Sequence, residues 1–213
     1  MNSTVNILIG VAMGLNLLAL ASARLPSVIR AVAVQGMILG VLPMLIEPHF
    51  DWRVAFVAAV TIAVKGFVIP ALLARAMRTA NIDREIEPFI GFVPSLLLGA
   101  AGTIGAIAGA RALPLLREHV DSLLVPGSLA SVLTGFVLLV GRTKAISQVC
   151  GYLVLENGIY LFGLLLIRST PLLVESGILL DLTVGIFVIG IIVDRIQRAF
   201  DTLDTRKLTA LRE

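Results

Sequence analysis

One cysteine, Cys150, and two histidines are the only thiol and imidazole groups in this chain of 213 residues. A single thiol excludes an intrachain disulfide and any CxxC metal or redox motif. So few sulfur and nitrogen ligands also exclude the usual haem and iron–sulfur sites. The sequence contains no nucleophile elbow, phosphate loop or zinc-protease helix motif. We therefore expect no cofactor, no metal site and no catalytic centre within this chain.

Charge is scarce as well. Only 15% of the residues are charged, 58% are hydrophobic and the mean hydropathy is +1.00, whereas a soluble domain carries about 25% charged residues. The net charge of +3 comes from basic residues that stand singly between apolar runs. Such spacing forms no basic stripe, so a nucleic-acid partner is not expected. The composition predicts an all-α integral membrane protein whose surroundings are the lipid bilayer.

Seven apolar runs have roughly the ~20-residue length that crosses about 30 Å of hydrocarbon. They are Thr4–Ala21, Val28–Ile46, Val54–Ala74, Phe89–Ala110, Pro126–Val140, Ile146–Ile167 and Pro171–Val193. The fifth is the shortest, and the stretch Leu123–Gly127 either extends it or breaks it. We divide the chain into a four-helix membrane region over residues 1–125, a three-helix membrane region over residues 126–198 and a cytoplasmic tail over residues 199–213.

The basic residues predict the orientation, since cytoplasmic loops of membrane proteins hold the excess of Lys and Arg. One set of alternate loops and the C-terminal tail contain twelve of the seventeen basic residues, and the other set contains four. This split predicts an external N-terminus and a cytoplasmic C-terminus. The twelve are Arg24, Arg30, Arg75, Arg78, Arg84, Arg142, Lys144, Arg195, Arg198, Arg206, Lys207 and Arg212, and the four are Arg53, Arg111, Arg117 and Arg168.

Three ionisable residues lie inside the predicted membrane segments: Lys65, Glu156 and Asp181. Each costs about 2.5 to 3.5 kcal/mol to insert at the bilayer centre, so each needs a partner, a cavity or a function. At ~1.5 Å of rise per residue, all three lie roughly 15 to 20 Å from the same predicted cytoplasmic boundary. The sequence therefore predicts a shared charged layer near the midplane, which is either a proton-transfer track or a static network that locks helix packing.

Three amide side chains, those of Asn16, Gln35 and Asn157, also fall within apolar segments. We expect them to hydrogen-bond between helices, which contributes roughly 0.6 to 2 kcal/mol each in membrane proteins. Packing is the preferred explanation for them.

The stretch from Gly141 to Gly163, and above all its run LENGIYLFG, resembles component E of hydrogenase-4-type complexes. The last three segments are in turn similar to the K-type subunit of complex I and the C-type subunit of multisubunit cation/proton antiporters. That pattern has a basic loop followed by two helices with central acids, and Arg142 and Lys144, Glu156 and Asp181 occupy those places. The second acid is Asp here, where the pattern usually has Glu.

The resemblance implies a non-catalytic membrane-arm subunit of a hydrogenase, formate hydrogenlyase or complex I-like oxidoreductase complex in a bacterial or archaeal cytoplasmic membrane. Its implied partners are antiporter-like membrane subunits, a quinone-site-like membrane subunit, and cytoplasmic hydrogenase and iron–sulfur subunits. Two alternatives remain open, a structural adaptor between membrane subunits and a stand-alone ion transporter. The latter is disfavoured because no interrupted helix is evident in the sequence.

Overall fold

The apolar runs form helices because a backbone in lipid must satisfy its hydrogen bonds internally. The computed structural model describes residues 3–46, 52–79, 88–113, 122–166 and 190. Its elements are α1 (Ser3–Ala21), α2 (Leu25–Ile46), α3 (Trp52–Ala63), the π-helical segment η1 (Val64–Val68), α4 (Ile69–Thr79), α5 (Phe92–Ala112), α6 (Leu124–Gly141), α7 (Ala145–Gly163) and the short 3₁₀ segment η2 (Leu164–Leu166).

Five helical stretches among the described residues are long and apolar enough to cross a membrane: Ser3–Ala21, Leu25–Ile46, Trp52–Arg78, Phe92–Ala112 and Leu124–Gly141. They correspond to the first five predicted segments. The sixth segment is the helix α7, whose mean hydropathy is lowered by Glu156 and Asn157 in its second half. The seventh segment, Pro171–Val193, and the tail over residues 199–213 lie outside the described residues, apart from the isolated Gly190.

The helix α6 shows which of the two alternatives for Leu123–Gly127 is realised. The helix begins at Leu124, so this stretch extends the fifth segment. Pro126 lies in the first turn, where a proline removes a backbone N–H that has no partner within the helix. The predicted fifth segment is therefore shorter than the helix because its predicted start, Pro126, lies two residues after the observed start.

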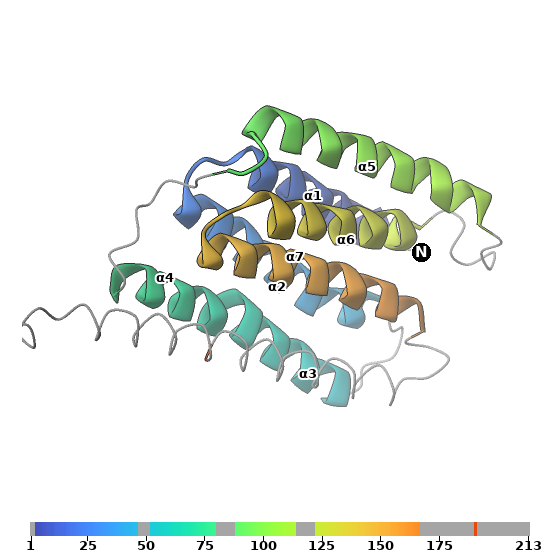
Figure 1. The fold of residues 1–213 in the computed structure, drawn as a ribbon. Coiled ribbons are helices and arrows are strands. Elements are labelled where there is room, and N and C mark those ends of the chain that lie inside the picture. The colour runs from blue at the N-terminus through green and yellow to red at the C-terminus, as the bar shows by residue number, and fades with distance from the viewer. Residues whose placement is uncertain (1–2, 47–51, 80–87, 114–121, 167–189, 191–213) are drawn as a thin grey trace, which may run out of the picture.

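The helices form layers, and α2 and α7 lie between α1, α5 and α6 on one side and α3 and α4 on the other (Figure 1). The outer helix α5 packs on α1 and α6, while α3 and α4 cover the other side of α2. The most extensive contact joins α6 to α7. Glycines allow this close approach, since a Cβ at Gly151 would lie 2.7 Å from the backbone nitrogen of Leu139. The helices α2 and α7, which are far apart in the sequence, also lie side by side.

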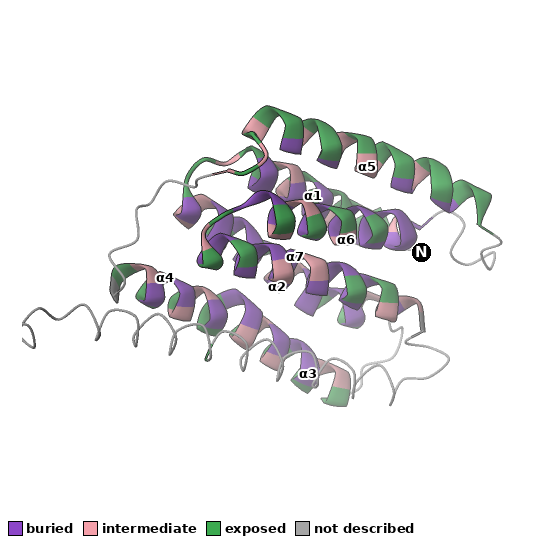
Figure 2. Ribbon diagram, in the orientation of Figure 1, coloured by how far each residue is buried: buried purple, intermediate pink, exposed green. Residues whose placement is uncertain are grey.

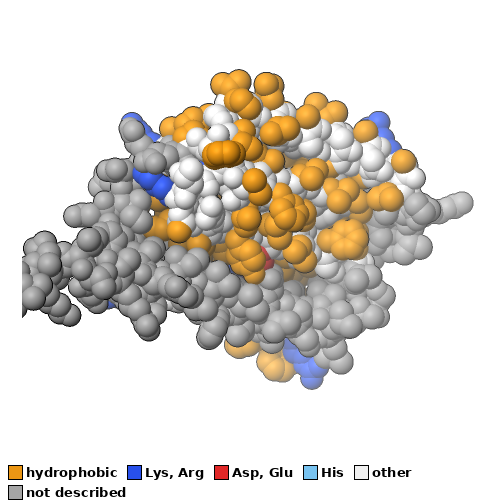
Figure 3. Space-filling view, viewed as in Figure 1, with side chains coloured by type: hydrophobic (Ala, Val, Ile, Leu, Met, Phe, Trp, Pro, Cys, Tyr) orange, Lys and Arg blue, Asp and Glu red, His pale blue; other side chains and the backbone are white. Residues whose placement is uncertain are grey.

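The outer surface is apolar. Figure 2 shows that α5 turns one narrow buried stripe toward the bundle and exposes the rest, and it is the least buried of the five candidate spans. Its exposed side chains include Val93, Leu97 and Ile104. In Figure 3 hydrophobic side chains cover the middle of the visible face, while Lys and Arg side chains appear toward its edges. This distribution fits a bundle surrounded by lipid.

Apart from the buried Lys65, the described basic residues separate into two groups at the two ends of the bundle. The loops Ser22–Arg24 and Arg142–Lys144 join antiparallel helices at one end, where Leu20 also accepts a hydrogen bond from Arg142. We call it the basic end, because all six described members of the predicted cytoplasmic set lie on this side of the bundle: Arg24, Arg30, Arg75, Arg78, Arg142 and Lys144. Arg53 and Arg111 lie at the opposite end, where α3 begins and α5 ends. Which end faces the cytoplasm stays a prediction.

The third span differs from the uninterrupted α-helix that the sequence predicts over Val54–Ala74. The chain stays helical from Trp52 to Thr79, but it adopts the π form over Val64–Val68, and the Ile69 N–H bonds to the Val64 carbonyl. The cause lies one residue further on. Pro70 has no N–H for the carbonyl of Gly66, and its ring would clash with that carbonyl in a regular α-helix. The wider π turn removes this conflict and carries Lys65.

Candidate functional site

Lys65 and Glu156 form an ion pair in the interior of the bundle. The Lys65 Nζ lies 2.8 Å from Oε1 of Glu156, and the two side chains are 5% and 1% exposed. Lys65 comes from the π-helical segment η1 and Glu156 from α7. Glu156 is the one acidic residue within the described ranges. Its partner is a buried amine and not a surface charge.

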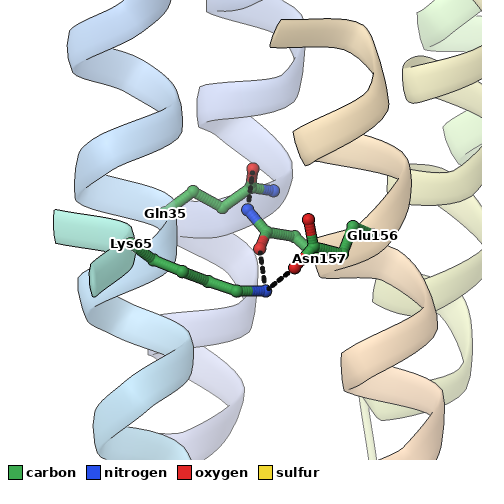
Figure 4. Close-up of polar contacts among 4 residues, drawn as sticks. All are labelled: Gln35, Lys65, Glu156 and Asn157. Atoms are coloured by element: carbon green, nitrogen blue, oxygen red, sulfur yellow. Dashed lines mark hydrogen bonds and ion pairs between the residues drawn. The ribbon is translucent and has the colours of Figure 1, made fainter. Parts of the chain in front are cut away.

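The amide of Asn157 links this pair to α2 (Figure 4). The Lys65 ammonium donates to Asn157 Oδ1 at 3.1 Å, and Asn157 Nδ2 donates to Gln35 Oε1 at 3.2 Å. Because Glu156 and Asn157 are neighbours on α7, one lysine bonds to two consecutive side chains. The ammonium therefore has an ion-pair contact with Glu156 and a hydrogen bond to Asn157 at once, and both are stronger in a low-dielectric interior than in water.

The hydrogen bonds continue across the bundle. Gln35 Nε2 donates to Asn16 Oδ1 at 2.9 Å, and Asn16 Nδ2 donates to Ser131 Oγ at 2.9 Å. We call the residues Lys65, Asn157, Gln35, Asn16 and Ser131 the buried polar chain. Each of the three amides donates away from Lys65, so the amide dipoles point in one sense and favour a positive charge at the lysine end. Amides are poor proton carriers, and this chain therefore holds the charge rather than conducting it.

An aromatic ring also contacts the lysine. The Lys65 Nζ lies 5.3 Å from the centroid of the Tyr160 ring, within the range of a cation–π interaction. Tyr160 follows Glu156 by one helical turn on α7 and is buried. The ring stabilises an ammonium that has left water.

We call the Lys65–Glu156 pair and the buried polar chain together the charged layer. This layer separates two apolar clusters. The first, which we call the basic-end cluster, contains Leu20, Leu25, Val28, Val32, Ile69, Leu73, Ile146, Val149 and Leu153 among others. The second, the opposite-end cluster, contains Val5, Ile9, Leu39, Leu42, Leu124 and Leu161 together with Tyr160. The polar layer is thus placed in mid-bundle, with hydrophobic packing toward both ends.

Glycine at position 36 sets how closely α2 approaches the π segment. A Cβ at Gly36 would lie 2.7 Å from the Lys65 Cβ, so a larger residue displaces the lysine backbone. Gly66 approaches Met37 in the same way from the other helix. The π turn and these glycines together position the Lys65 amine against α7.

A second buried cation, Arg142, lies at the basic end. Arg142 is 2% exposed, donates from Nη2 to the Leu20 carbonyl at 2.7 Å, and lies 4.8 Å from the Phe92 ring centroid. Its contacts join the end of α1 to the start of α5. The Gln148 Nε2 also donates to the backbone carbonyl of Arg142 at 3.0 Å. Burial lowers the pKa of the Arg142 guanidinium from its ordinary value. The sequence predicts a loop charge at Arg142, and the structure gives this residue a packing role as well.

The predicted site residues have different outcomes. The structure brings Lys65 and Glu156 into direct contact, and it joins Asn16, Gln35 and Asn157 by interhelical hydrogen bonds. Asp181 lies outside the described residues. Sequence reasoning missed Ser131 and Tyr160, for which the only signal was a polar atom within an apolar helix. No group of three or more His, Cys, Asp or Glu side chains that suits a metal occurs in the described part of the chain.

These features define a multi-pass helical membrane protein with a charge-compensated polar layer at mid-depth. The chain belongs to the same family as the uncharacterized protein Rv0085 of Mycobacterium tuberculosis, with 34% identity over 191 residues that cover 89% of this chain and 87% of the relative. It is also a distant homologue of hydrogenase-4 component E of Escherichia coli K12, with 29% identity over 150 residues, 70% of this chain and 68% of the relative. The component E of Shigella flexneri matches to the same extent. No family model and no solved structure matches the chain.

Proposed function

We propose that this protein is a membrane-arm subunit of a membrane-bound hydrogenase or complex I-like complex, without a catalytic centre of its own. In this role the Lys65–Glu156 pair forms part of a midplane proton path, and Asp181 is the next acid along it. The observation that carries the proposal is the buried ion pair at mid-depth, in a chain homologous to hydrogenase-4 component E. The proposed partners are antiporter-like and quinone-site-like membrane subunits with cytoplasmic hydrogenase and iron–sulfur subunits.

The short distance of the ion pair supports proton transfer, because the Lys65 Nζ lies 2.8 Å from Glu156 Oε1. Moving one proton from Lys65 Nζ to Glu156 Oε1 converts an ion pair into a neutral amine and a neutral carboxylic acid. The polar chain and the Tyr160 ring both contact the ammonium, so they hold the amine in place beside the carboxylate.

A structural adaptor is the second candidate. It is favoured by the apolar clusters on both sides of the layer and by an amide chain that ties α1, α2, α6 and α7 together. Under this hypothesis the charges hold neighbouring subunits in register and no proton moves through them.

Purification in mild detergent through a C-terminal tag tests membership of a complex. We expect antiporter-like and hydrogenase subunits to co-purify with hydrogenase activity. Recovery of the chain alone would overturn the membrane-arm proposal and leave the stand-alone transporter, which predicts ion transport by the pure chain in liposomes.

The variant Glu156→Gln then separates the two candidates, since Gln keeps the size and an oxygen that accepts from Lys65. We expect subunit recovery and hydrogenase activity to be retained, while acidification of inverted membrane vesicles is largely lost. Thr61→Val is the matched control, because Thr61 is fully buried one turn before Lys65 and its hydroxyl has no hydrogen-bond partner in the described part of the chain. Unchanged acidification in Glu156→Gln would favour the adaptor.

A further inference from the structure

A small cavity adjoins the ion pair. It is partly open, offers about 10 Å³ of space for the centre of a water molecule, and is lined by Val32, Lys65, Ile69, Leu153 and Asn157. Lys65 and Asn157 supply its polar wall, and the other three side chains are apolar. The cavity is therefore polar where it meets the charged layer and hydrophobic elsewhere.

The cavity lies on the basic-end side of the charged layer. Val32 precedes Gln35 by about one turn on α2, and Leu153 precedes Asn157 by one turn on α7. Both helices begin at the basic end. Ile69 follows Lys65 by one turn on the helix that ends there. All three apolar lining residues belong to the basic-end cluster.

The size and chemistry of the cavity select its ligand. About 10 to 15 Å³ of space for the centre of a water molecule, with at least two polar partners, is what one buried water needs. The Lys65 ammonium disfavours a second cation, and the space is too small for an organic anion. Water fits because it accepts from the ammonium and bonds to the Asn157 amide.

We propose that this cavity is a single-water site through which the Lys65–Glu156 pair exchanges protons with the aqueous phase at the basic end. The direction of proton exchange rests on the proposed function, whereas the water site does not. On the other side, Lys65 faces the ring of Tyr160, which belongs to the opposite-end cluster. The layer is therefore asymmetric, with water toward one end and an aromatic ring toward the other.

The proton steps balance without a change of redox state. Lys65 Nζ gives one proton to Glu156 Oε1, so that one N–H bond breaks and one O–H bond forms. The water then gives a proton to the neutral amine and recovers one from the aqueous phase through transient waters. Val28, Leu73 and Val149, one further turn toward the basic end, are buried and apolar, so this last exchange is the slow one.

Silver-ion access to introduced cysteines tests the site in the assembled protein within its native membrane. Leu153→Cys places a thiol at the cavity in a Cys150→Ala background, which removes the one native thiol of this chain. Leu161→Cys is the matched control, because Leu161 is a buried leucine on the same helix, two turns away in the opposite-end cluster. Either substitution removes side-chain volume to a similar extent, so any space that it creates is common to both.

Ag⁺ is added from one face of the membrane, the protein is denatured, and this chain's remaining thiols are labelled with a maleimide. Thr143→Cys in the exposed connection between α6 and α7 identifies the basic-end face. We expect Ag⁺ from that face to abolish most labelling of Leu153→Cys and to leave Leu161→Cys fully labelled. The proposal is overturned if Ag⁺ protects both thiols equally from maleimide labelling or protects Leu161→Cys alone. It is also overturned if Ag⁺ does not protect Leu153→Cys.

The pair Val32→Cys and Leu39→Cys on α2 provides the same comparison if an α7 variant does not assemble. Val32→Leu then fills the cavity and shows whether protons use it. If Ag⁺ protects Leu153→Cys but Val32→Leu leaves vesicle acidification unchanged, the water site stands and its role in proton exchange is wrong. If acidification is absent in the wild type too, the proposed function fails, and the Ag⁺ result still decides the water site.

Discussion

The amine of Lys65 meets the carboxylate of Glu156 at 2.8 Å, although the two residues belong to the first and second halves of the chain. The contact depends on the π turn at Lys65, on the glycine at position 36, which lets η1 approach α2, and on the packing of α2 against α7. The pair is therefore a product of three separate features of the fold, and each feature can be changed independently.

The two charges should depend on each other for stability. Removing one partner of a buried ion pair typically costs about 3 to 5 kcal/mol, whereas replacing both by apolar residues is often nearly neutral. We expect Lys65→Met and Glu156→Leu each to lower the melting temperature, and the double variant to recover most of the loss. A thiol-reactive fluorescent dye measures this in the chain produced without its proposed partners, because Cys150 is fully buried until unfolding. Additive losses in the double variant would show that the pair contributes no coupling.

Asn157 should matter more than the far end of the polar chain. Asn157→Leu removes one acceptor from the Lys65 ammonium and leaves Gln35 Oε1 without its donor, and an unpartnered buried polar atom costs about 1 to 3 kcal/mol. Ser131→Ala leaves only one Asn16 N–H without its acceptor, so we expect a smaller loss in the same thermal assay. Thr134→Val is the control, since the buried Thr134 hydroxyl has no hydrogen-bond partner in the described residues. A larger effect from Ser131→Ala would contradict the order of the chain.

Gly36 should tolerate no side chain. Gly36→Ala brings a Cβ to 2.7 Å from the Lys65 Cβ, and relieving such overpacking typically costs about 1 to 3 kcal/mol. Gly14→Ala is the matched control, because a Cβ there meets nothing within 4 Å and alanine is the better helix former. We expect a clear fall in melting temperature for the first variant and none for the second. Equal behaviour of the two would mean that α2 and η1 are less closely packed than the structure shows.

Pro70 should maintain the register of Lys65. Pro70→Ala supplies the N–H that an α-helical turn needs and removes the ring that clashes with the Gly66 carbonyl. We expect the π turn to be lost and Lys65 to rotate away from Glu156. The measurement is the coupling free energy between Lys65 and Glu156 from the double-mutant cycle, repeated in the Pro70→Ala background. Undiminished coupling would show that the π turn has another cause.

The sequence alone determined the membrane class and the approximate positions of the described helices, because a span must be long and apolar whatever it packs against. It also identified Lys65 and Glu156 as residues in need of partners, since charges in lipid are rare and costly. The helix ends at Leu25, Leu124 and Thr79 differed by a few residues from the predicted ones, as turns containing proline or charge lower the local hydropathy.

Only the tertiary structure decided which groups meet. Hydropathy has no information about which face of a helix touches which neighbour, so it left the partner of Lys65 open and gave no reason to single out Ser131 or Tyr160. The π turn adds a residue to one helical turn and so rotates the side chains on either side of it relative to each other. A one-dimensional reading places Lys65 at the right depth, but its direction depends on that turn and on the glycine contact with α2, and both exist only in the packed bundle.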